Sequence, residues 1–229
     1  MRPAVFASIV FIASIVACSG PDQDVAPATI QWLEWPAEVL AATPFEARIV
    51  LSPPACHPHT FRAGMTRDES AVTFAPYFLV KRKPLICPPT ASASDFAPNI
   101  ALDTLLTVPG LAASDPRTFE MRASASVEPP PPSAGAGEPP IRTFGDVIVQ
   151  LAKPDTSRRN AAGRVMLQID IEGCVRLVPV GAFNPALGVV LEDQADTVGL
   201  AFAFVRGYLH DATSPVCGQT RVFHLSSRN

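Results

Sequence analysis

The clearest structural signal in the sequence is the stretch Thr118-Phe119-Glu120-Met121-Arg122-Ala123-Ser124-Ala125-Ser126-Val127. Apolar side chains at the odd-numbered positions alternate with polar side chains at the even-numbered positions throughout this stretch. Successive side chains of a β-strand point to opposite faces of a sheet. This period of two therefore predicts a strand that buries one face in a core.

Further strands are predicted on both sides of this stretch. Residues 44–51 alternate in the same way, and residues 29–35, 71–80 and 100–108 are largely apolar runs that end shortly before a proline. After residue 20, no segment keeps a 3.6-residue apolar period over three helical turns. The sequence therefore predicts an all-β protein.

Three segments of this region resemble bacterial immunoglobulin-like domains. They are Glu38-Val39-Leu40-Ala41-Ala42-Thr43-Pro44-Phe45-Glu46-Ala47-Arg48, Thr107-Val108-Pro109-Gly110-Leu111 and Thr118-Phe119-Glu120-Met121-Arg122-Ala123. The resemblance implies an immunoglobulin-like β-sandwich over residues 29–152. In such sandwiches a tyrosine near the start of strand F bonds back through its hydroxyl group. Phe119 stands at the comparable place and lacks that group, so this chain departs from the pattern there.

A proline-rich segment follows, at residues 128–140. Proline lacks a backbone donor, so this composition predicts an extended segment rather than packed structure. The segment is either a linker between domains or a long hairpin loop. We favour the loop, because residues 142–152 contain Val147, Val149 and Leu151 in alternation. They would form the last strand of the sandwich and pair with residues 118–127.

A second unit is predicted over residues 161–227, after the polar, turn-rich boundary at 153–160. Val165, Leu167, Ile169 and Ile171 alternate with Met166, Gln168, Asp170 and Glu172. Further short strands are predicted at residues 188–192, 200–209 and 220–225. About five short strands in so few residues favour a small closed barrel, because closure removes exposed strand edges, and we predict an OB-like barrel.

The N-terminus carries an export signal. Arg2 precedes an uncharged stretch, residues 4–17, that is shorter than the roughly 20 residues a spanning helix needs. The stretch fits a signal peptide over residues 1–17. It ends in Ile15-Val16-Ala17-Cys18, which resembles a bacterial lipobox. The resemblance implies cleavage before Cys18 and attachment of fatty acyl chains such as palmitate to it; the alternative is an ordinary signal peptide in which Cys18 is incidental.

The acylated terminus implies a location in the cell envelope. By analogy with lipoproteins, Ser19 rather than Asp after the cysteine favours the outer membrane in a cell with two membranes, with the protein facing the periplasm or the surface. Two or more acyl chains give stable membrane anchoring, whereas one binds only weakly. Residues 18–28 are then predicted to be a flexible tether.

Four cysteines remain after Cys18. An even number in an exported chain favours two disulfides, although three connectivities are possible and free, buried thiols are the alternative. We favour Cys56–Cys87 and Cys174–Cys217, because each bridge then lies inside one proposed domain.

The strongest candidate for metal binding is the stretch Cys56-His57-Pro58-His59. A thiolate and two imidazoles suit zinc or copper, and Met65 would add a soft ligand. An oxidised Cys56 and histidines in a polar loop are the simpler interpretation. Two groups of acidic residues are further candidates. Asp170 and Glu172 would share one face of a strand, as in a hydrolase, and Glu192, Asp193 and Asp196 would bind Ca²⁺; a solvated surface explains both groups.

The function classes can be narrowed further. A net charge of −3 argues against a broadly basic nucleic-acid-binding surface. The sequence contains no nucleophile elbow, zinc-protease, phosphate-loop or dinucleotide motif, so we predict neither catalytic residues nor a cofactor. The leading hypothesis is a non-enzymatic envelope lipoprotein with a binding, scaffolding or accessory role. Its partners would be the membrane, through its lipid, and other envelope proteins. The alternatives are a periplasmic ligand- or metal-binding module that uses residues 56–59, and an undetected hydrolase.

Overall fold

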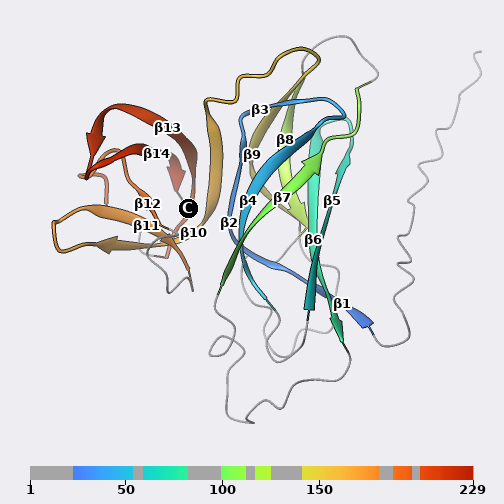
Figure 1. Cartoon of the computed structure of the whole chain (residues 1–229), viewed down its shortest axis with the longest axis horizontal. Helices are drawn as coiled ribbons and strands as arrows, with labels where there is room; N and C mark the ends of the chain where they lie inside the picture. The colour runs from blue at the N-terminus through green and yellow to red at the C-terminus, as the bar shows by residue number, and fades with distance from the viewer. Residues whose placement is uncertain are drawn as a thin grey trace, which may run out of the picture.

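The structure is a computed structural model, and it describes residues 23–53, 59–81, 99–111, 117–124, 141–180, 188–197 and 202–228. Every regular element in these ranges is a β-strand, which confirms the all-β prediction (Figure 1). The strands are β1 (Gln23–Pro27), β2 (Thr29–Pro36), β3 (Glu38–Leu40), β4 (Pro44–Ser52), β5 (His59–Arg67), β6 (Ala71–Lys81), β7 (Ile100–Thr107), β8 (Arg117–Ser124), β9 (Ile141–Gln150), β10 (Arg159–Ile169), β11 (Val175–Pro179), β12 (Val189–Val190), β13 (Phe204–Val216) and β14 (Gln219–Arg228).

The strands form two sheets. One sheet has the order β1-β6-β8-β9-β3, with β5 also paired to β6. The other has the order β12-β11-β10-β2-β4-β7, and β13 joins it on β10 and carries β14. Side chains from both sheets share one buried cluster that includes Trp35, Phe74, Phe119 and Phe144. The N-terminal part of the chain is therefore a two-layer sandwich, and its immunoglobulin-like character remains a prediction.

The strand at residues 118–127 is confirmed over its described part. Phe119, Met121 and Ala123 are fully buried, whereas Glu120 and Arg122 are partly exposed. Strand β8 pairs antiparallel with β9, from Arg117 opposite Val149 to Ser124 opposite Ile141. The proline-rich segment thus connects two neighbouring strands of one sheet, as the hairpin-loop interpretation requires, although residues 125–140 lie outside the described residues.

Strand β10 belongs to both parts of the molecule. Its first half pairs with β2 on one side, where Gly163 lies opposite Trp32, and with β13 on the other, where Gly163 lies opposite Val205. Its second half pairs with β11. The polar segment before β10 therefore does not interrupt the hydrogen-bonded sheet, and the predicted C-terminal unit continues the sheet of the sandwich.

The C-terminal strands curl back on themselves (Figure 1). The pairings run from β10 to β11, β12, β14, β13 and back to β10, and a single parallel bridge between Leu191 and Phe223 links the β12 and β14 sides. Inside lies a second cluster of buried side chains, which includes Val165, Leu177 and Phe223. The predicted Cys174–Cys217 disulfide is present and joins the residue before β11 to the turn between β13 and β14. An OB-like topology remains a prediction.

Two predictions made from local composition are wrong. Residues 23–27 were assigned to the flexible tether, but they form β1, which pairs with β6 from Gln23 opposite Lys81 to Pro27 opposite Tyr77. Backbone pairing at a sheet edge needs no apolar side chain, so composition did not reveal it. Asp170 and Glu172 were assigned to a strand face, but β10 ends at Ile169. The Asp170 carboxylate accepts the backbone N–H groups of Glu172 and Cys174 and so fixes a turn instead.

Candidate functional site

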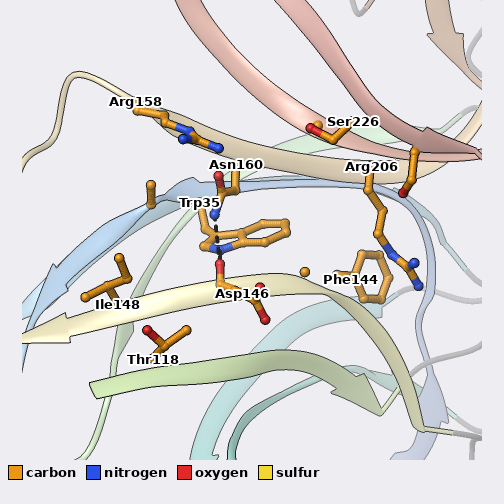
Figure 2. Close-up of a pocket in the computed structure, with 13 residues that line it drawn as sticks. Trp35, Thr118, Phe144, Asp146, Ile148, Arg158, Asn160, Arg206 and Ser226 are labelled. Carbon is orange, nitrogen blue, oxygen red and sulfur yellow. Dashed lines mark hydrogen bonds between the residues drawn. The ribbon is translucent and has the colours of Figure 1, made fainter. Parts of the chain in front are cut away.

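A pocket of about 370 Å³ opens where the β13–β14 hairpin diverges from the sandwich (Figure 2). Its walls come from β2, β8, β9, β10, β13 and β14, so both sheets contribute to it. The lining includes apolar side chains (Trp35, Phe144, Ile148), hydroxyl groups (Thr118, Ser226, Ser227), the amide of Asn160 and two guanidinium groups (Arg158, Arg206). This mixture of apolar walls and convergent polar groups is typical of small-molecule sites.

Strand register places the central residues of this region in one row. Trp35 lies opposite Asn160, Asn160 lies opposite Tyr208, and Tyr208 lies opposite His224. Side chains of directly paired residues lie on the same face of a sheet. The row therefore runs from the sandwich core across β2, β10, β13 and β14 to the surface.

Two hydrogen bonds fix the inner end of the row. The indole Nε1–H of Trp35 donates to the Asp146 carbonyl oxygen at 3.0 Å, and Asn160 Nδ2 donates to the same oxygen at 2.8 Å. Figure 2 labels Trp35, Asn160 and Asp146 together at this end of the pocket. Trp35 is only 1% exposed, so its indole ring belongs to the core.

The two arginines are held in different ways. Arg158 is exposed, and its guanidinium group stacks 3.8 Å from the centre of the Tyr208 ring. Arg206 donates from Nη2 to the Thr143 carbonyl oxygen at 3.1 Å and lies over the Phe204 ring. The Nε–H group of Arg206 is buried and has no hydrogen-bond partner among the described residues.

A histidine–carboxylate cluster adjoins the outer end of the row. Glu192 Oε2 lies 2.7 Å from His224 Nδ1, and Glu192 Oε1 lies 3.2 Å from His210 Nε2. The second contact is electrostatic, because His210 Nε2 makes no hydrogen bond within the described residues. The hydrogen bond with His224 is the largest cause that lowers the pKa of Glu192 below its ordinary value, and His210 lowers it further.

The lowered pKa of Glu192 predicts a small acid-sensitive contribution to stability. Because the pKa is lower in the folded chain than in the unfolded chain, the stabilisation is fully present above the ordinary value of 4.5 and disappears as the pH falls through the folded value. The carboxylate is 36% exposed, so solvent screening limits the effect to about 1 kcal/mol or less. Urea unfolding at pH 6 and pH 3 should show a smaller loss for Glu192→Gln than for the unchanged chain. An equal loss in both would contradict this prediction.

Of the residues predicted to bind metal, the structure describes His59 and Met65. Cys56 and His57, like Cys18 and Cys87, lie outside the described residues. His59 begins β5 rather than lying in a loop, and its ring packs edge-on against Phe78 at 5.0 Å between centroids. Met65 packs against the sandwich core. No group of three or more His, Cys, Asp or Glu side chains among the described residues has the geometry to hold a metal ion.

The predicted acidic groups have structural partners. The Asp193 carboxylate accepts the backbone N–H of Ala195, and Asp196 pairs with Arg228. Asp170 is also paired with Arg176, at 3.4 Å. These contacts agree with the interpretation of Asp170, Asp193 and Asp196 as part of a turn-forming surface.

Comparison with known proteins does not assign this chain to a family. No protein-family model, curated protein or solved structure matches this chain. The described residues also contain no helix with the length and apolar character needed to cross a membrane. The candidate site therefore depends on the geometry of the pocket alone.

Proposed function

We propose that this protein is a lipid-anchored, non-enzymatic binding protein of the cell envelope. The segment Ile15-Val16-Ala17-Cys18 supports the anchor, because a small residue before cysteine at the end of a short apolar stretch matches the lipobox pattern. The Cys174–Cys217 disulfide is the observation that carries the location, since such bridges form and persist mainly in oxidising compartments. The acyl chains would hold the β-structured body at a membrane surface, and at the outer membrane in a cell with two membranes.

The pocket between the sandwich and the β13–β14 hairpin supports a binding role. Its inner hydrogen-bond donors, on Trp35 and Asn160, are already satisfied by the Asp146 carbonyl oxygen, so they serve to shape the pocket. Its other polar side chains carry hydroxyl groups, guanidinium groups and the exposed carboxylate of Asp146, which recognise ligands by hydrogen bonding. Binding of a ligand or of an envelope protein at this position is the role that the geometry favours.

Substitution of the proposed lipidation site tests the anchor. We expect Cys18→Ala to abolish incorporation of a clickable palmitate analogue in growing cells, because the Cys18 sulfur is the proposed attachment site. The variant protein should also leave the membrane fraction and appear in the soluble fraction. Ser19→Asp is the matched control: it should keep the label but move the protein between the two membranes of a diderm host. Equal labelling of the unchanged and Cys18→Ala chains, or none in either, would overturn the proposed anchor.

A further inference from the structure

The pocket contains a buried donor that lacks an acceptor. Arg206 Nε is buried and has no hydrogen-bond partner within the described residues, although Nη2 of the same group bonds the Thr143 carbonyl oxygen. The carboxylate of Glu120 acts on Arg206 only at longer range, because its oxygens already accept bonds from Thr143 Oγ1 and Arg122 Nε. A buried charged donor without an acceptor is unfavourable, and an anion that entered the pocket would satisfy it.

The charge of the lining also favours an anion. Arg158 and Arg206 both line the pocket, and Figure 2 shows them on opposite sides of Trp35. The only carboxylate of the lining belongs to Asp146, whose side chain is exposed. Ser226 and Ser227 add hydroxyl donors from β14. Guanidinium groups with nearby hydroxyl groups are suited to carboxylate or phosphate oxygens.

Arg158 is oriented in advance by a stack of aromatic rings. Its guanidinium group lies over Tyr208, Tyr208 stacks on His224 with 4.7 Å between ring centroids, and His224 is held by Glu192. A stacked guanidinium group loses less conformational freedom when it binds a ligand, so the stack favours affinity. Tyr208 and His224 are therefore positioning residues.

The rest of the pocket is apolar and small. Trp35, Phe144 and Ile148 supply hydrocarbon surface, and Gly145 adds no side chain beside the Trp35 ring. A volume of about 370 Å³ lies near the lower end of the range for ligand sites. The space thus suits a short apolar group rather than a long chain or a folded partner.

We propose that this pocket binds a small organic anion, a carboxylate or a phosphate monoester, whose charged group is attracted by the guanidinium groups of Arg158 and Arg206 and whose short apolar part packs on Phe144 and Ile148. The proposal specifies the ligand class for the binding role proposed above. It does not depend on the lipid anchor, because no residue of the pocket lies near the N-terminus in sequence.

The chain provides its own reporter for this test. It contains two tryptophans, and therefore two indole N–H signals in a nitrogen–proton NMR spectrum. The Trp35 indole N–H bonds the Asp146 carbonyl oxygen at the pocket, whereas that of Trp32 bonds Glu34 and its ring packs on Phe223. Titration of the full chain in detergent with hexanoate or hexyl phosphate should shift the Trp35 signal in a saturable manner and leave the Trp32 signal in place.

Four probes separate the contribution of the charged group from that of the apolar group. Hexanol has the apolar part without the charge and should bind at least about tenfold more weakly than hexanoate, because it cannot pair with the guanidinium groups. Inorganic phosphate has the charge alone and should bind more weakly than hexyl phosphate. A preference for hexanoate identifies a carboxylate ligand, and a preference for hexyl phosphate identifies a phosphate monoester. Equal binding of hexanol and both anions, or no saturable shift with either anion, would overturn the proposal.

Variants of the pocket residues test which side chains bind the anion. Arg158→Gln and Arg206→Gln should each weaken anion binding about tenfold. Arg158 is exposed, so its variant tests the proposal even if Arg206→Gln fails to fold. Arg62→Gln, on the exposed face of β5, is the matched control and should leave binding unchanged. Tyr208→Phe should keep the affinity, because it keeps the stack, and Tyr208→Ala should reduce it. Unchanged binding in both pocket arginine variants would overturn the proposal, while loss of palmitate labelling at Cys18 would affect only the anchor.

Discussion

Gly163→Ala is expected to lower the free energy of unfolding by on the order of 3 kcal/mol or more. A Cβ atom at this position would lie 2.1 Å from the Gln31 carbonyl oxygen and 2.8 Å from the Trp32 Cα atom. Both are backbone atoms of β2, so a side-chain rotation cannot relieve the overlap. The two strands would have to separate where β10 joins the sandwich sheet to the C-terminal curl.

The measurement is urea unfolding followed by tryptophan fluorescence. Trp32 lies opposite Gly163, and Trp35 lies on the same strand, so both fluorophores report on this junction. Gly64→Ala is the matched control, because a Cβ at Gly64 on β5 would have no atom within 4 Å and its stability should change by less than about 1 kcal/mol. A Gly163→Ala chain as stable as Gly64→Ala would show that the close approach of β2 and β10 is wrong.

The sequence predicted strands well where one face is buried. Phe119, Met121 and Ala123 on β8 belong to the core, and so do Ala47, Ile49 and Leu51 on β4, because period-two alternation depends only on local burial. Strand β5 shows the same signal, since Phe61, Ala63 and Met65 pack against the core. The neighbouring cysteine and histidines instead favoured a polar loop, so the sequence analysis does not predict a strand at β5.

Strand partners were harder to predict than strands. The favoured pairing of β8 with β9 is confirmed, because both strands alternate and lie close in sequence. The pairing of β10 with β2 joins residues more than 120 positions apart, and nothing in the local pattern of either strand specifies the other. The sequence therefore could not predict that the C-terminal unit and the sandwich share one sheet through β10 and β2.

The candidate site was missed for the same reason. Asn160 was part of a turn-rich boundary in the sequence, and His210 and His224 were isolated residues without an assigned role. Antiparallel register brings Asn160 to Tyr208 and Tyr208 to His224, and the turn after β12 adds Glu192. None of these residues forms a short motif, so only the three-dimensional pairing reveals the cluster.

The double variant Cys174→Ser and Cys217→Ser is expected to lose about 4 kcal/mol of stability relative to the oxidised chain. The bridge joins residues 43 positions apart, and closure of a loop of that length removes about this much conformational free energy from the unfolded chain in the chain-entropy model. It also links the start of β11 to the two-residue turn between β13 and β14, where Val216 pairs with Gln219.

This bridge matters because few other contacts close the curl on that side. Strand β12 has two residues, and the parallel bridge of Leu191 with Phe223 is the backbone ladder contact that joins its side to β14 among the described residues. The side chain of Gln194 adds bonds to the Val175 N–H and carbonyl groups, at 2.6 and 3.2 Å. These bonds join the turn after β12 to β11 and do not reach the β13–β14 turn, so without the disulfide opening should begin at the seam between β11 and that turn.

Denaturant unfolding with and without reductant separates this bridge from the one proposed between Cys56 and Cys87. Reductant should lower the stability of the unchanged chain at least as far as the double serine variant. Any further loss when that variant is reduced belongs to the other cysteine pair, and a variant with Cys56→Ser and Cys87→Ser should remove it. Hydrogen exchange should speed up first in β13 and β14, because the seam opens there before β2 and β10 separate. A double serine variant that unfolds at the same denaturant concentration as the oxidised chain would show that the closed curl is stable without its cross-link.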